Sequence, residues 1–87
     1  MADALETRVI EILAAQALID PASIAPDATL DSLGLDSLGL VEAIFAIEEA
    51  FGVSVPFNAN EPDASGFDIS TVATVVAGVR RLVAARQ

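Results

Sequence analysis

Two aspartate–serine pairs are the residues of this chain whose type and spacing could support chemistry. Asp31-Ser32 and Asp36-Ser37 stand five positions apart, and each pair is followed by Leu-Gly-Leu. A serine hydroxyl can act as a nucleophile or as the cap of a helix. Nucleophilic catalysis would need a base beside the serine, but the chain contains neither histidine nor lysine. The pairs therefore favour a role at a helix start over a hydrolase.

Ser37 differs from Ser32 in the residues that follow it. The apolar residues after Ser37 recur at helical spacing, with acidic residues on the other faces: Leu40, Ile44, Ile47 and Phe51. Ser32 is followed instead by Gly34, which is unfavourable inside a helix. We therefore expect Ser37 to be the N-cap of a helix over residues 37–51, with its hydroxyl at the surface. The free N–H groups of such a helix start favour an anion such as phosphate.

The other carboxylates do not form a recognisable metal or acid–base site. Asp27, Asp31 and Asp36 do not have the spacing of an EF-hand calcium loop, and no glutamate closes such a loop. Glu48 and Glu49 are adjacent, and adjacent residues on a helix do not face each other. We therefore predict no metal site and no catalytic residue, and expect a protein that is not an enzyme.

Three helices are expected to position these residues. Apolar residues at spacings of three and four predict a first helix from Ala2 to about Ala17. The helix over 37–51 is the second. A third is predicted from a cap at Ser70 or Thr71 to about residue 85, where valines recur at helical spacing. Because β-branched valines lower helix propensity, packing must hold this last helix.

The sequence predicts the connection between the first two helices in more detail than the connection before the last helix. Asp20-Pro21 is predicted to end the first helix, because the residue before proline avoids helical angles. The long connection over 20–36 is expected to be pinned to the core by three apolar anchors: Ile24, Leu30 and Leu33. Residues 57–68 contain Pro62 and Gly66 and could carry one short helix. The predicted fold is a single all-α domain over 1–87, with three main helices and a short helix between the second and the last.

Composition excludes several classes of partner and site. The formal net charge is −9 and cysteine is absent, so disulfides and thiolate metal sites are excluded. Between Arg8 and Arg80 there is no basic residue, and this span contains eleven acids. Such a surface repels nucleic acid and anionic membranes, and it attracts basic surfaces of partner proteins. No apolar run is long enough for a membrane span, and the first residues lack the positive charge of a signal peptide, so we expect a cytoplasmic protein.

Four short motifs give the chain a family resemblance. They are Gly34-Leu35-Asp36-Ser37-Leu38, Val41-Glu42, Glu48-Glu49-Ala50-Phe51 and Val55-Pro56. In this order and at these spacings they resemble the acyl carrier proteins, over most of the chain. The triplet Asp-Ser-Leu alone would be a weak motif, but the helix behind Ser37 and the later motifs make the resemblance specific.

The resemblance implies a cofactor and a role. In that family the serine of Asp-Ser-Leu carries 4′-phosphopantetheine, derived from coenzyme A, through a phosphodiester. The resemblance places this group on Ser37, with Asp36 and Leu38 beside it. The terminal thiol of the arm holds an acyl group as a thioester and presents it to enzymes of fatty acid or lipid biosynthesis. The partners implied are a phosphopantetheinyl transferase, an acyl-loading enzyme, and synthases or acyltransferases with basic surfaces, acting on a monomeric carrier.

One face of the second helix is predicted to receive these partners. We define the docking face by its residues: Val41, Glu42, Phe45, Glu48 and Glu49. Glu42, Phe45 and Glu49 are spaced at three and four, so they share one side of a helix that begins at Ser37. Apolar groups rimmed by acids are typical of a surface that binds a partner.

Three departures from the fatty-acid-synthesis pattern indicate a specialised carrier. Gly39 stands where that pattern usually has an acid, and Ala43 where a larger aliphatic residue is common. The segment after Pro56 is longer by about half a dozen residues. A stand-alone polyketide or peptidyl carrier is an alternative, and so is a helical interaction module that is never modified, with Ser37 as a simple cap. The sequence identifies neither the acyl group nor the pathway.

Overall fold

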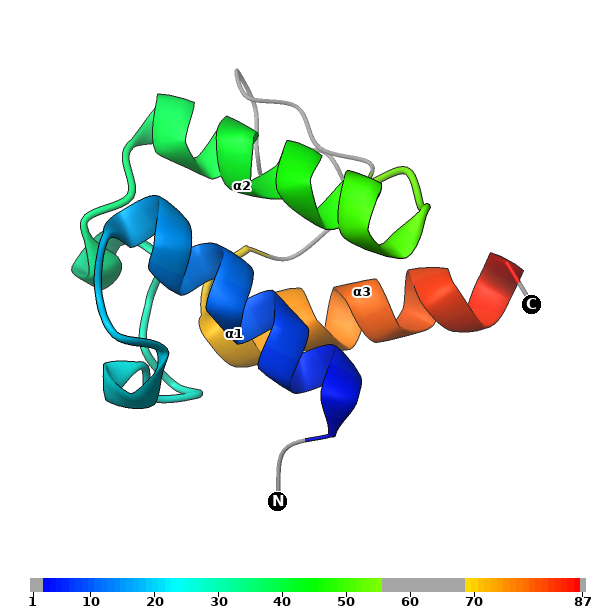
Figure 1. The fold of residues 1–87 in the computed structure, drawn as a ribbon, viewed down its shortest axis with the longest axis horizontal. Helices are drawn as coiled ribbons and strands as arrows, with labels where there is room; N and C mark the ends of the chain where they lie inside the picture. The colour runs from blue at the N-terminus through cyan, green and yellow to red at the C-terminus, as the bar shows by residue number, and fades with distance from the viewer. Residues whose placement is uncertain (1–2, 56–68, 87) are drawn as a thin grey trace.

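The fold is built from three helices and two short 3-10 turns. The computed structural model describes residues 3–55 and 69–86, with the elements α1 (Ala4–Ala17), η1 (Pro21–Ser23), η2 (Asp31–Leu33), α2 (Ser37–Phe51) and α3 (Val72–Arg86). Figure 1 shows α1 running obliquely from beside α3 to the start of α2. The all-α prediction is confirmed, since no strand occurs within those two ranges. The short helix predicted between the second and last helices falls outside the described residues.

Each helix buries one apolar stripe, as the residue spacing predicts. The buried residues of the three helices are Val9, Ile12, Leu13 and Ala14; Ala43, Ile44 and Ile47; and Val72, Val75, Val76 and Val79. Leu40 and Phe51 lie at the edge of the α2 stripe and are only partly buried. Fully burying an aliphatic side chain stabilises a fold by about 1.5–3 kcal/mol, so these stripes hold the helices together. No helix in the described part of the chain is long and apolar enough to cross a membrane.

The helix α1 ends at Ala17, as predicted, but its start and the cause of its ending differ from the prediction. Asp3 is the N-cap, and its Oδ1 accepts a hydrogen bond of 2.9 Å from the N–H of Glu6, so the helix begins at Ala4. The prediction that Asp20-Pro21 ends this helix is wrong. Leu18 already adopts the left-handed conformation, with φ of 60°. The N–H groups of Leu18 and Ile19 then turn back onto the last carbonyls of the helix.

The long connection between α1 and α2 is pinned to the core. Ile24 and Leu30 are buried, as predicted, and Leu33 is partly buried against the core. Leu35 is also buried, which the sequence analysis missed. Four apolar anchors within twelve residues therefore hold a segment that contains only two short turns.

The same connection closes the start of α3. The N–H of Val72 donates to the carbonyl of Ala28 at 2.9 Å, and the N–H of Ala73 donates to that of Pro26 at 2.8 Å. Thr71 is the cap, as predicted, because its Oγ1 accepts from the N–H of Thr74 at 3.2 Å. The orphan donors of this helix start are thus satisfied by the loop.

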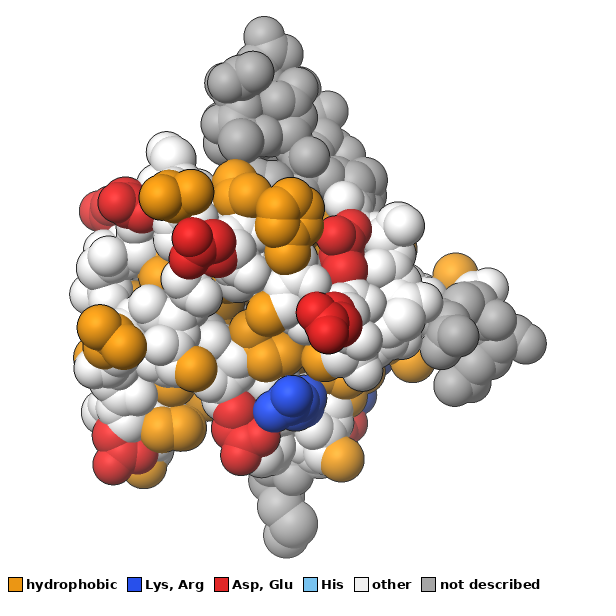
Figure 2. Space-filling model, turned by 45° about the horizontal axis from the view of Figure 1, so that its top comes forward, with side chains coloured by type: hydrophobic (Ala, Val, Ile, Leu, Met, Phe, Trp, Pro, Cys, Tyr) orange, Lys and Arg blue, Asp and Glu red, His pale blue; other side chains and the backbone are white. Residues whose placement is uncertain are grey.

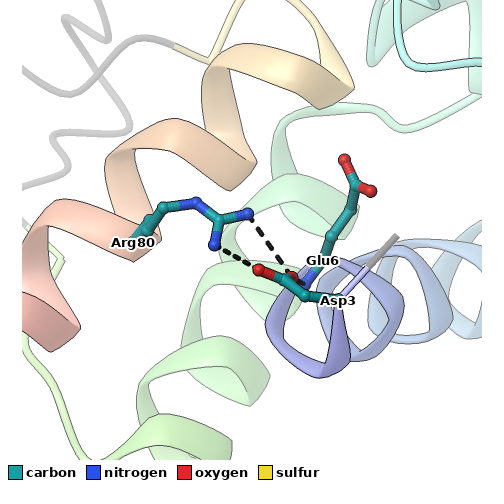
Figure 3. Close-up of polar contacts among 3 residues, drawn as sticks. All are labelled: Asp3, Glu6 and Arg80. Atoms are coloured by element: carbon teal, nitrogen blue, oxygen red, sulfur yellow. Dashed lines mark hydrogen bonds and ion pairs between the residues drawn. The ribbon is translucent and has the colours of Figure 1, made fainter. Parts of the chain in front are cut away.

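Arg80 links the middle of α3 to the start of α1. Figure 3 shows its guanidinium paired with the carboxylate of Asp3, which lies 77 positions away in the sequence. Hydrogen bonds from Arg80 and from the N–H of Glu6 hold the pKa of Asp3 below its ordinary value. Both side chains are exposed, so the pair adds little to stability in solution.

Candidate functional site

Ser37 is the first residue of α2, and Asp36 is its N-cap. The prediction that Ser37 caps this helix is therefore wrong. Asp36 has an extended backbone, and its Oδ1 accepts a hydrogen bond of 2.8 Å from the N–H of Gly39. Its carbonyl oxygen accepts from the N–H of Leu40 at 2.9 Å. Because Asp36 satisfies these donors, the backbone does not require the hydroxyl of Ser37.

The two candidate serines differ in how their hydroxyls are used. Ser32 Oγ donates to the carbonyl of Thr29 at 2.7 Å, and the N–H of Ser32 donates to Thr29 Oγ1 at 3.0 Å. Ser37 is exposed, and its hydroxyl has no hydrogen-bond partner among the residues that the structure describes. Ser37 is therefore the hydroxyl that a modifying enzyme can engage without first breaking a contact.

The start of α2 is also more open to an anion than the start of α3. The first N–H groups of α3 donate to carbonyls of the long connection. At the start of α2 the Asp36 side chain occupies the N–H of Gly39. The N–H groups of Ser37 and Leu38 have no partner within residues 3–55 and 69–86. Free N–H groups at a helix start favour a phosphate, so an ester at Ser37 would lie in a compatible field.

Leu38 and Gly39, which follow Ser37, give this helix start an exposed apolar side chain and a position with little room for a Cβ atom. Leu38 leaves 68% of its surface exposed. Gly39 lies one position further on, and a Cβ atom there would stand 3.2 Å from Asp36 Oδ1 and 3.4 Å from Leu35 Cδ2. A side chain at this position would therefore crowd the capping carboxylate. No group of three or more potential metal ligands occurs in the described part of the chain.

The docking face lies on the outer side of α2. Phe45 is 62% exposed, Glu42 and Glu49 are exposed, and Val41 and Glu48 are partly buried. Figure 2 shows acidic and hydrophobic side chains interspersed on the face that α2 turns toward the viewer. The structure thus places all five residues on one helix that begins at Ser37.

The acids of the docking face are not equivalent. Glu48 Oε2 accepts a hydrogen bond of 2.7 Å from the N–H of Val55, so this carboxylate stabilises the chain after α2. Glu42 Oε2 accepts from the side-chain amide of Gln16 on α1 at 2.6 Å. The sequence analysis missed both partners. No local motif could have found Gln16, which stands 26 positions before Glu42.

Comparison with known proteins assigns the class of this domain. Residues 7–79 match the family described as "Phosphopantetheine attachment site". "Acyl carrier protein AcpXL" of Mesorhizobium japonicum is 35% identical over 85 residues, which cover 91% of each chain. The protein of the same name from Brucella melitensis is 33% identical over 86 residues, covering 92% of each chain. "Acyl carrier protein" of Syntrophobacter fumaroxidans is 43% identical over 54 residues, 61% of this chain and 67% of the relative.

The match defines a phosphopantetheine-binding domain. The chain belongs to the acyl carrier protein family, whose members are carriers and not catalysts. The domain of this family carries covalently attached 4′-phosphopantetheine, whose thiol supplies the thioester chemistry. The residues at the start of α2 fit such a group, because they combine an exposed hydroxyl with N–H groups that have no partner in the described part of the chain.

Proposed function

We propose that Ser37 bears the 4′-phosphopantetheine arm and that the chain delivers acyl thioesters to enzymes of fatty acid or lipid biosynthesis. The observation that carries this proposal is the hydroxyl of Ser37, which is exposed and free at the first position of α2, whereas that of Ser32 is bonded to Thr29. We place the whole chain, residues 1–87, in one carrier domain that acts as a cytoplasmic monomer.

The neighbours of Ser37 have separate roles in this proposal. Asp36 caps α2 and thereby fixes Ser37 in the first helical turn. The N–H groups of Ser37 and Leu38 balance the negative charge of the phosphodiester. The exposed Leu38 side chain offers apolar contact to the transferase or to the root of the arm.

The docking face receives the partner enzymes. Glu42 and Glu49 attract basic side chains of a phosphopantetheinyl transferase, an acyl-loading enzyme, or a synthase or acyltransferase. Phe45 supplies apolar contact at the centre of the face, with Val41 beside it. Glu48 contributes charge, although its bond to Val55 restricts its position. Because the face begins at Ser37, a partner bound there has the root of the arm within reach.

The comparisons favour a specialised carrier. Two relatives that cover more than nine-tenths of the chain, from Mesorhizobium japonicum and Brucella melitensis, have the name AcpXL. Gly39 agrees with this, because it leaves the position after Leu38 without the acid of the general pattern. We therefore place the chain in a dedicated lipid pathway, ahead of a polyketide or peptidyl assembly line.

Intact-mass measurement tests the function directly. The purified chain is incubated with coenzyme A and a broad-specificity phosphopantetheinyl transferase. We expect a mass increase of one phosphopantetheinyl group and, when acyl-coenzyme A replaces coenzyme A, of one acylated group. An unchanged mass, while a known carrier in the same tube is fully modified, would instead support an interaction module in which Ser37 is only a helix residue.

A further inference from the structure

Glu48 of the docking face also holds the chain that leaves α2. Its carbonyl oxygen accepts from the N–H of Gly52 at 2.8 Å and from the N–H of Val53 at 3.2 Å. Its side-chain Oε2 accepts from the N–H of Val55 at 2.7 Å. Of the four residues that follow the helix, all except Ser54 therefore donate a backbone hydrogen bond to Glu48. Only the bond to Val55 depends on the carboxylate.

The bond between Glu48 and Val55 connects the docking face to the core. Val55 leaves only 8% of its surface exposed and belongs to the buried cluster that includes Ile44 and Ile47 of α2. Glu48 follows Ile47 directly in the sequence and is itself partly buried. The backbone of a core residue is therefore held by a carboxylate of the docking face. A change in the partner of that carboxylate acts directly on the core.

No cation balances the charge of Glu48 in the described part of the chain. Both ion pairs found there involve acids of α1 or of its cap, and neither includes Glu48. The N–H of Val55 is a neutral donor, and the adjacent Glu49 adds a like charge. A guanidinium is a charged donor that can bind both oxygens of a carboxylate. An arginine of a partner therefore competes well with the single N–H of Val55.

We propose that an arginine of the docked transferase draws the carboxylate of Glu48 away from Val55, so that docking loosens the core behind the docking face. The guanidinium pairs with both oxygens of Glu48, and the N–H of Val55 binds water instead. The side chain of Glu49 has no hydrogen bond within the described residues, so it only attracts the partner. This inference rests on the proposed function and adds a conformational change to the docking.

Amide hydrogen exchange, followed by NMR, tests this coupling in the parent chain. The broad-specificity transferase is added to saturation without coenzyme A, so that the carrier is bound but not modified. We expect the amide of Val55 to exchange about tenfold faster in the complex than in the free chain, because the bond that protects it is lost. The amide of Val79, within α3, should keep its rate. A Val55 rate that is unchanged or slower at saturation would overturn the inference.

Three variants separate the role of Glu48 from that of charge in general. Glu48→Gln keeps an acceptor for Val55 but loses the charge, so the Val55 amide should exchange slowly with and without the transferase. Glu48→Ala removes the acceptor, and this amide should exchange about tenfold faster already in the free chain. Glu49→Gln is the matched control, in which saturating transferase should still release Val55.

Two results with these variants would contradict the coupling. They are release of Val55 in Glu48→Gln and failure to release it in Glu49→Gln. The same samples distinguish this inference from the proposed function once coenzyme A is added. If the parent chain is not modified, the proposed function fails, whereas a modified parent whose Val55 amide does not respond refutes this inference alone.

Discussion

The pentapeptide Asp-Ser-Leu-Gly-Leu occurs twice in direct succession, at 31–35 and 36–40, and it adopts a different structure each time. The first copy forms the single turn η2, which Gly34 ends in the left-handed conformation with φ of 88°. The second copy opens α2, a helix of 15 residues in which Gly39 is part of the first turn. Identical residues therefore do not determine whether this segment becomes a turn or a helix.

The neighbours of the two copies decide the difference. Before the first copy stands Thr29, which binds both the N–H and the hydroxyl of Ser32. At its end Leu35 is buried, so the chain turns inward after one turn. After the second copy, apolar residues continue at helical spacing and belong to the same buried cluster as residues of α1 and α3. An enzyme that selects one of the two serines must therefore recognise the helix and not the triplet.

The largest expected difference between the copies is in modification. Ser37→Ala should abolish the mass increase given by coenzyme A and the transferase, because no hydroxyl remains at the start of α2. Ser32→Ala should be modified at a rate close to that of the parent, since Ser32 Oγ is bonded to Thr29. Fragment mass spectrometry of the modified parent locates the group. Modification that survives in Ser37→Ala and disappears in Ser32→Ala would reverse the assignment.

The two glycines should respond differently to alanine. Gly34→Ala introduces a Cβ into open space but in a left-handed backbone, so we expect a loss of about 1 kcal/mol and a midpoint lower by about 4–8 °C. Gly39→Ala gains helix propensity of up to about 1 kcal/mol, offset by a contact of 3.2 Å with Asp36 Oδ1. Its stability should stay within about 0.5 kcal/mol of the parent. Chemical denaturation of both variants measures the difference, and equal losses would contradict it.

Replacing Asp36 should lower the free energy of unfolding by the contribution of a helix cap, whereas replacing Asp31 should not. Asp36→Ala removes the acceptor of the Gly39 N–H and should lower the free energy of unfolding by about 1 kcal/mol. The Asp31 side chain makes no comparable bond within the described residues, and the cap position of its turn is held by Leu30, which has no side-chain hydrogen bond. Asp31→Ala should therefore change stability by less than about 0.5 kcal/mol. Asp36→Asn is the control, since asparagine caps a helix about as well as aspartate.

The smallest expected effect concerns the turn of the first copy. Thr29→Val keeps the shape of the side chain but removes Oγ1, which accepts from the N–H of Ser32. We expect a loss of about 0.5 kcal/mol, because this exposed donor can bind water instead. The rate of modification at Ser37 should not change. A drop in that rate would show that the turn η2 takes part in presenting the second serine.

The three helices could be predicted because their apolar spacing carries the information. The residues that cap or end the helices could not be predicted in the same way. Both Asp36 and Ser37 are good capping residues, and only the backbone geometry shows that the aspartate takes this role. The end of α1 near Ala17 was predicted, but its cause was not, because leucine rarely adopts the left-handed conformation seen at Leu18.

Contacts between residues far apart in the sequence are the second feature that could not be predicted from the sequence. The bond between Gln16 and Glu42 and the pair of Asp3 with Arg80 join residues 26 and 77 positions apart. Periodicity predicts which face a residue occupies but not which polar group on another element it meets. The sequence could therefore place Glu42 on the docking face but could not show that Gln16 donates a hydrogen bond to it. The choice of Ser37 as the attachment site stays a prediction, with the free hydroxyl in its support.

The bonds from the long connection to the start of α3 have a consequence for local unfolding. The N–H groups of Val72 and Ala73 end on the carbonyls of Ala28 and Pro26, so this stretch cannot detach without exposing the first turn of α3. We therefore expect the connection and that turn to open as one cooperative unit. Deuterium should enter the amides of Val72 and Ala73 whenever the loop lifts, and more slowly in the later turns of α3. We therefore expect the segment that leads to Ser37 to open together with the first turn of the last helix, and not independently of it.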